Sequence, residues 1–247
     1  MRQCACQGRR KTKSLNRFKH PPRVGFFMKT LLPFLTELAA NNNREWFTAN
    51  KKRYETAKKE LSEFLDQLIP ALAETEPNLA DLKAKDCMFR IFRDVRFSKN
   101  KDPYKTNMGA VIAPGGRKST KGCYYIHIDP NGCFLAGGMY MPEPDKLKLI
   151  RQEIDYNLTD FEKLIHAKNF QNLFGSLDDN GRLKTSPKGY NTDNPAIEYI
   201  KNKSFTASTS FPTSRIIESN FMDFCLTTFA EIRPLNEFLN RATDLVD

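Results

Sequence analysis

Long apolar runs are missing from this chain of 247 residues, and so are the short motifs of common nucleotide-binding proteins and hydrolases. No stretch approaches the roughly 20 apolar residues of a membrane-spanning helix, which excludes a spanning segment. There is no P-loop, dinucleotide-binding glycine motif or nucleophile elbow. Only three histidines are present, and the six cysteines are scattered without Cys-x-x-Cys spacing. We therefore expect neither a metal nor a cofactor.

Acidic residues are absent from residues 1–27, which carry eight lysines and arginines. Removing these eight charges from the net charge of +10 leaves only +2 for the rest of the chain. We expect residues 1–27 to be a basic extension, although such an arm also suits phosphate contacts. Its charges are not followed by the apolar core of a secretory signal, so we expect a cytoplasmic protein with reduced thiols.

The remaining residues, 28–247, are expected to form one α+β domain. Apolar residues at helical spacing predict helices at both ends, with interruptions at Pro70 and Pro234. Between about residues 86 and 140, runs rich in β-branched and aromatic residues are separated by turn signals. Short links predict an antiparallel meander of strands. These strands are expected over residues 88–97, 106–113, 123–129 and 133–140, with a later strand over 203–209.

Positive charge is concentrated between Asp86 and Lys121, where nine basic residues accompany three acidic ones. Guanidinium groups bind phosphate and carboxylate through paired hydrogen bonds. We therefore expect an arginine-rich sheet site for a small phosphorylated or carboxylated ligand, with Asp94 orienting the arginines. The expected ligand-binding residues are Arg90, Arg93, Arg96, Lys99, Lys101, Tyr104 and Lys105.

Two other functions remain open. The same basic strip suits a nucleic-acid-binding module with Phe92, Tyr104 and Tyr125 as stacking platforms, although a body charge of +2 argues against it. Alternatively, the arginines pair with Asp94 inside a structural or interaction protein. A concave, convex or internally paired arrangement of the basic groups distinguishes the three.

Candidate catalytic residues are few, and the residues do not decide whether the chain is an enzyme. Glu45 opens a predicted helix beside the single tryptophan, and Asp94 lies among the arginines. His127 shares a strand face with Tyr125 and Asp129, a combination that suits acid–base chemistry. The oligomeric state is also left open.

Four segments resemble a known microbial family. They are NREWF at residues 43–47, FRIFRDVRFSKNKDPYKTNMGAVI at 89–112, GGMYMPEPDKL at 137–147 and LKTSPKGYNTDNPAIEYIKNKSF at 183–205. Together they resemble the conserved hypothetical proteins of the domain-of-unknown-function family numbered twenty-four sixty-one. The resemblance covers nearly all of residues 28–247 and leaves the basic extension outside. It implies no assigned activity, substrate or catalytic residue.

Overall fold

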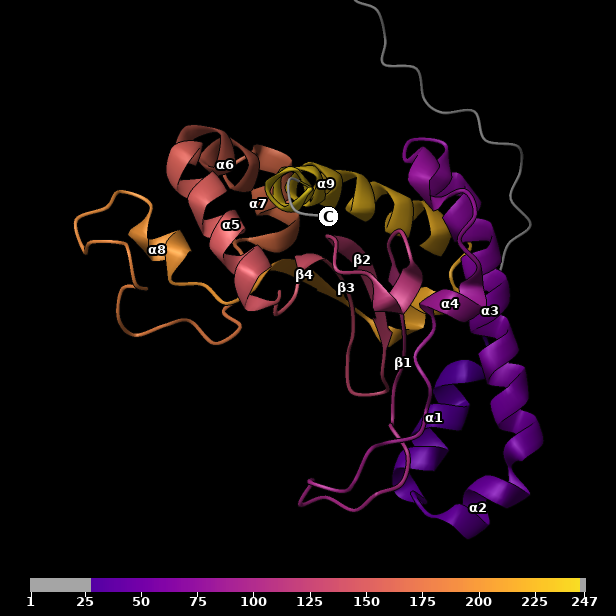
Figure 1. Cartoon of the computed structure of the whole chain (residues 1–247). Coiled ribbons are helices and arrows are strands. Elements are labelled where there is room, and N and C mark those ends of the chain that lie inside the picture. The colour runs from indigo at the N-terminus through magenta and orange to yellow at the C-terminus, as the bar shows by residue number, and fades with distance from the viewer. Residues whose placement is uncertain (1–27, 245–247) are drawn as a thin grey trace, which may run out of the picture.

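The structure is a computed structural model that describes residues 28–244, so the expected basic extension lies outside the described residues. Buried side chains from Met28 to Ala242 form one contiguous hydrophobic core. A four-stranded sheet lies at the centre, with helices at its two ends and along one face (Figure 1). The expected α+β class is therefore confirmed.

The sheet is an antiparallel meander in the order β1-β2-β3-β4. Its strands are β1 (Met108–Ile112), β2 (Cys123–Ile128), β3 (Cys133–Met139) and β4 (Phe205–Phe211). Tyr125 lies opposite Val111 on one side and Ala136 on the other, and Ala136 lies opposite Ser208. These four side chains therefore share one face of the sheet. The expected later strand is confirmed as β4.

Helix α9 (Phe221–Thr243) covers the opposite face, where Tyr124 packs against Phe229 with ring centroids 4.8 Å apart. A Cβ atom on Gly137 would collide with the side chain of Ile232, so the absence of a side chain allows close packing. Asn236, only 3% exposed, accepts a hydrogen bond from the Gly138 amide (2.9 Å) and donates to the Cys123 carbonyl (3.2 Å). One buried amide thus ties α9 to both β2 and β3.

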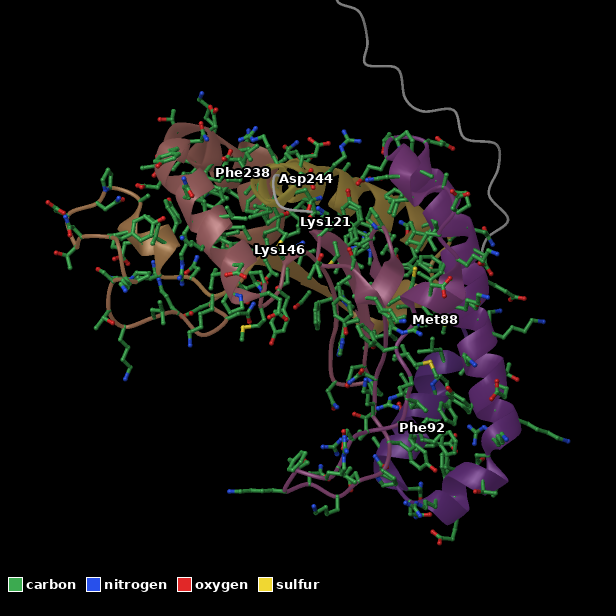
Figure 2. All side chains as sticks on the ribbon, in the orientation of Figure 1. Met88, Phe92, Lys121, Lys146, Phe238 and Asp244 are labelled. Carbon is green, nitrogen blue, oxygen red and sulfur yellow. The ribbon has the colours of Figure 1, made fainter. Side chains whose placement is uncertain are left out.

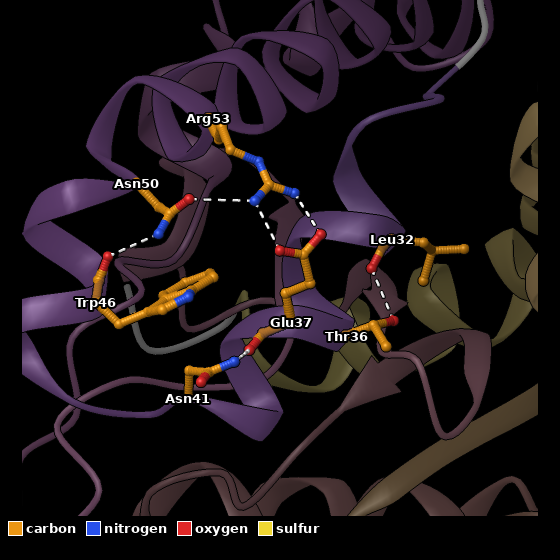
Figure 3. Close-up of polar contacts among 7 residues, drawn as sticks. All are labelled: Leu32, Thr36, Glu37, Asn41, Trp46, Asn50 and Arg53. Atoms are coloured by element: carbon orange, nitrogen blue, oxygen red, sulfur yellow. Dashed lines mark hydrogen bonds and ion pairs between the residues drawn. The ribbon is translucent and has the colours of Figure 1, made fainter.

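The N-terminal helices α1 (Leu31–Ala40), α2 (Arg44–Ala49) and α3 (Lys51–Ala73) form a second layer at one end of the sheet. Figure 3 shows the polar contacts that join them. Arg53 of α3 binds both carboxylate oxygens of Glu37 on α1, at 2.6 and 2.7 Å. The side chain of Asn50 accepts a bond from Arg53 and donates to the Trp46 carbonyl, which fixes the turn between α2 and α3.

Shorter elements complete the fold. A 3-10 turn (Pro77–Leu79) and α4 (Ala84–Cys87) follow α3, and further 3-10 turns cover Gly116–Lys118 and Thr213–Ile217. The other end of the sheet carries α5 (Pro144–Tyr156), α6 (Leu158–Ile165), α7 (Lys168–Phe174) and α8 (Ile197–Ile200).

The two prolines expected to interrupt helices lie inside them instead. Pro70 lies within α3 and Pro234 within α9. A proline leaves the carbonyl four residues earlier without its helical partner. Those carbonyls belong to the exposed residues Asp66 and Ala230, where water is available, while the buried faces of both helices keep their packing.

Residues 88–97 do not form the first regular strand that was expected. They run beside residues 103–110, bridged only at Met88–Ala110 and Phe92–Tyr104. The Phe89 amide donates to the Gly109 carbonyl, whereas the Lys105 amide donates to the Ile91 carbonyl. Between these two hydrogen bonds the chain advances by two residues on one side, from 89 to 91, and by four on the other, from 105 to 109. This unequal spacing interrupts a regular ladder. We call residues 88–107 the ribbon; Figure 2 labels Met88 and Phe92 along it.

A half-buried carboxyl group yields a pH-dependent prediction for this fold. Tyr124 donates a hydrogen bond to Glu76, and burial raises the pKa of Glu76 above its ordinary value of 4.5. The folded state then holds the proton more tightly than the unfolded state, so the free energy of unfolding falls as pH rises through this range. Glu76→Gln keeps an acceptor without the charge. Its melting temperature relative to the wild type should therefore increase between about pH 4 and pH 7.

Tyr124→Phe is the matched control, because it removes the hydroxyl donor and leaves the carboxylate in place. It should lower the melting temperature more at neutral pH than at acidic pH, since only the ionised carboxylate needs a donor. Thermal unfolding followed by circular dichroism measures both variants. A pH-independent difference for Glu76→Gln would contradict the assigned pKa direction.

Candidate functional site

The sheet face opposite α9 carries a pocket of about 640 Å³. Its floor consists of strand residues with small or medium side chains, including Val111, Cys123, Ala136 and Ser208. Aromatic side chains and a polar segment after α7 rise around this floor. These lining residues are Phe89, Tyr125, His127, Phe134, Tyr140, Asp178, Asp179, Asn180 and Thr206.

Three rings form one wall of the pocket. His127 and Phe134 lie opposite each other on β2 and β3 and stack with centroids 4.5 Å apart. The Tyr125 hydroxyl lies 3.0 Å from His127 Nδ1, in a hydrogen bond whose direction follows the imidazole tautomer. A Cβ atom on Gly109 would lie 2.7 Å from that hydroxyl, so only glycine leaves room for Tyr125 here.

Burial keeps these groups uncharged at neutral pH. It raises the pKa of Tyr125 to about 12, and the nearby Cys123 thiol adds to the increase. Burial also raises the pKa of Cys123 itself to about 12 and lowers the pKa of His127 below 6.5, although Asp129 opposes the latter shift. The expected acid–base candidate His127 therefore lies in the pocket as a neutral ring.

The β4 side of the pocket is polar and acidic. Asp178 accepts hydrogen bonds from the hydroxyls of Thr206 (2.8 Å) and Ser208 (2.7 Å). Its amide donates to the Thr206 carbonyl, which fixes the segment along the outer edge of β4. Asn180 donates to the Thr206 hydroxyl at 2.9 Å. This group was not identified from the sequence; the alternation of Thr206 and Ser208 in β4 was the available signal.

Positive charge from the ribbon lies near the opposite side of the pocket, beside a lining ring. Lys105 Nζ lies 5.3 Å from the centroid of the Phe89 ring, which lines the pocket. Burial lowers the pKa of Lys105, and the charge of nearby Arg90 lowers it further. Of the expected ligand-binding residues, Lys105 thus contacts a pocket-lining ring, and the exposed Arg90 adjoins Phe89 in sequence.

The other basic residues of the expected site lie further along the ribbon and interact within it. Arg96 binds both carboxylate oxygens of Asp94, at 3.0 and 2.7 Å, and this pairing lowers the pKa of Asp94. Arg93 is half-buried and lies 3.9 Å from the Asp102 carboxylate. Lys101 donates to the Val95 carbonyl (3.0 Å), whereas Lys99 is exposed. The structure does not gather these side chains into one concavity.

Tyr104 anchors the ribbon to the N-terminal helices. It is buried and stacks on Phe47 of α2 with centroids 3.9 Å apart. The side-chain amide of Asn42 accepts from the Tyr104 amide (3.1 Å) and donates to its carbonyl (3.0 Å), a role that the sequence did not reveal. Glu45, the remaining catalytic candidate, is exposed in the first turn of α2.

Residues 28–244 contain neither a metal-binding cluster of side chains nor a membrane-spanning helix. Among residues 28–244, no three His, Cys, Asp or Glu side chains cluster closely enough to hold a metal ion. Over the same range, no helix combines the length and apolar character needed to span a membrane.

Comparison with known proteins gives a family without an assigned activity. A family model described as conserved hypothetical protein (DUF2461) matches residues 30–238. The chain belongs to this family. The resemblance of the four sequence segments is thereby confirmed, and the matched DUF2461 region includes the whole sheet and all pocket-lining residues. No curated protein and no solved structure matches the chain.

The lowered pKa of His127 gives a prediction for this DUF2461 pocket. As pH falls below about 6.5, the unfolded chain protonates this histidine before the folded chain does, so the free energy of unfolding should decrease. Nuclear magnetic resonance titration should place the His127 ring below pH 6.5, and His127→Gln should reduce the loss of melting temperature between pH 7 and pH 5.5. A ring that titrates at or above pH 6.5 would contradict the burial described here.

Proposed function

We propose that this protein binds a small organic molecule with a phosphate or carboxylate group in the pocket on the open sheet face. The observation that carries the proposal is a cavity of about 640 Å³, within the size range typical of ligand sites, on a face that α9 leaves uncovered. Aromatic walls with a few polar groups at the edges are the usual composition of such sites.

Lys105 supports an anionic group on the ligand. Among the described residues, no carboxylate lies within ion-pair distance of its ammonium group, which faces Phe89 at the pocket. Desolvation lowers its pKa, so a bound phosphate or carboxylate would offset an existing cost. Arg96, by contrast, already has a carboxylate partner in Asp94.

Filling the pocket tests this proposal. Ala136 lies on the pocket floor, whereas Ser210 is exposed on the same sheet face and does not line the pocket. A library of phosphorylated and carboxylated metabolites should contain compounds that raise the melting temperature of the wild type. A ligand at a hundredfold excess over its Kd stabilises by about 2.7 kcal/mol, which corresponds to several degrees. Ala136→Leu should abolish this shift.

Ser210→Leu is the matched control, because it introduces the same side chain outside the pocket. It should retain the ligand-induced shift of the wild type. Equal shifts in all three proteins would place the ligand elsewhere, and no shift with any compound would count against a small anionic ligand.

A second candidate function, single-stranded nucleic-acid binding, is favoured by the outer end of the ribbon. Phe97 is 96% exposed, and the Arg96 guanidinium carbon lies 5.8 Å from the centroid of its ring. Exposed Lys99 and Lys101 follow within four residues. Exposed rings beside cations stack on bases and contact phosphates.

Fluorescence anisotropy with a labelled oligothymidine tests this candidate in the full chain. Phe97→Ala should weaken binding by roughly tenfold if a base stacks on the ring, because such stacking is worth about 1–3 kcal/mol. Tyr156→Ala is the matched control, since Tyr156 is an exposed ring (72%) on α5, away from the ribbon. Equal affinities of the two variants would exclude the Phe97 ring as a stacking platform.

A further inference from the structure

An acidic side chain lines the β4 side of the pocket, and a lysine lies near its β1 side. Asp178 lies outside β4, where its amide donates to the Thr206 carbonyl. Lys105 lies in the segment that leads into β1 and does not itself line the pocket, but its ammonium group is 5.3 Å from the centroid of the pocket-lining Phe89 ring. With adjacent strands about 4.8 Å apart, the two outer strands of a four-stranded sheet are separated by roughly 14 Å.

The acidic end retains capacity to accept further hydrogen bonds. Each oxygen of Asp178 accepts one hydroxyl proton, from Ser208 at Oδ1 and from Thr206 at Oδ2. An ionised carboxylate has about four acceptor positions, so about two stay open. Because these hydroxyls donate to Asp178, their remaining lone pairs also favour a donor from the ligand. An amino group suits this end of the pocket.

The middle of the pocket suits a flat group. Ala136, Cys123 and Val111 provide a low floor, while the rings of Tyr125 and Phe134 stand beside it with centroids 5.7 Å apart. An aromatic group of a ligand can pack favourably against the edges or faces of these two rings. No charged side chain lines this central part, which is consistent with an apolar or aromatic body between two polar ends.

We propose that the ligand is a nucleoside monophosphate whose base carries an exocyclic amino group, an inference that rests on the proposed function. The amino edge would donate to Asp178, the base would lie over Ala136, and the phosphate would reach Lys105. The α-ammonium and α-carboxylate groups of a free amino acid share one carbon, so this pair of groups cannot contact both ends. A nucleotide places its amino edge and its phosphate at opposite ends of one molecule.

Matched nucleotides test the donor end by isothermal titration of the full chain. AMP and IMP differ at one exocyclic position, where adenine has an amino group and hypoxanthine a carbonyl, and in the proton that hypoxanthine carries on the neighbouring ring nitrogen; CMP and UMP differ in the same way. A hydrogen bond to a charged group predicts that AMP or CMP binds at least about tenfold more tightly than its partner. Asp178→Asn should reduce this preference to less than about threefold, with circular dichroism confirming the fold.

The contact between the ligand's phosphate and Lys105 is tested by comparing a nucleotide with its nucleoside. AMP should bind more tightly than adenosine in the wild type, and Lys105→Met should reduce the ratio of the two affinities to less than about twofold. Lys99→Met is the matched control, because Lys99 is exposed on the same ribbon and makes no cation–π contact with the pocket-lining Phe89 ring, as Lys105 does; it should retain the wild-type ratio.

The outcomes separate this inference from the proposed function. Equal or tighter binding of IMP and UMP would overturn the amino-group assignment. If no nucleotide binds while other phosphorylated or carboxylated compounds stabilise the wild type and not Ala136→Leu, the proposed function stands and the nucleotide inference fails. If no compound in either set acts through the pocket, both fail.

Discussion

The close packing of α9 against one face of the sheet determines which face is buried in the core and which face stays open. Asn236 satisfies backbone groups of both β2 and β3, and Gly137 lets the helix approach without a side chain between them. All large aliphatic residues of β2 point to this side and are buried. The hydrophobic core is therefore completed on one face, which releases the other face from packing and allows it to carry polar and aromatic groups.

The N-terminal helices act on the open face indirectly, through the ribbon. Tyr104 is held by Asn42 and by stacking on Phe47, and it directly precedes Lys105. Near its start, the ribbon is hydrogen-bonded to the sheet through the amide of Phe89, whose side chain lines the pocket. Residues far apart in sequence thus cooperate, because α1 and α2 fix the ribbon and the ribbon places a lysine beside the pocket.

Local patterns predicted the fold well but did not reveal how the side chains of the candidate site are arranged. Alternating residues and turn signals located β1, β2, β3 and β4, because each signal lies within a few residues of the chain. Residues 88–97 had the composition of a strand, but their ladder is interrupted by unequal spacing opposite residues 105–109, which depends on tertiary structure. The arginine pattern predicted charge but not its direction, since Arg96 turns to Asp94 on its own segment. Asp178 was missed because its contacts with Thr206 and Ser208 span about thirty residues.

The central claim is that the open sheet face, and not the outer ribbon, is the ligand-binding surface. The most direct test is a nuclear magnetic resonance screen of the isotope-labelled protein against a library of small aromatic and phosphate-containing fragments. Bound fragments are expected to shift the amide signals of Tyr125, Ala136 and Ser208 together. Fragments that shift only the amide signals of residues 94–102, or that leave the amide signals of the sheet unchanged, would contradict binding on the open sheet face.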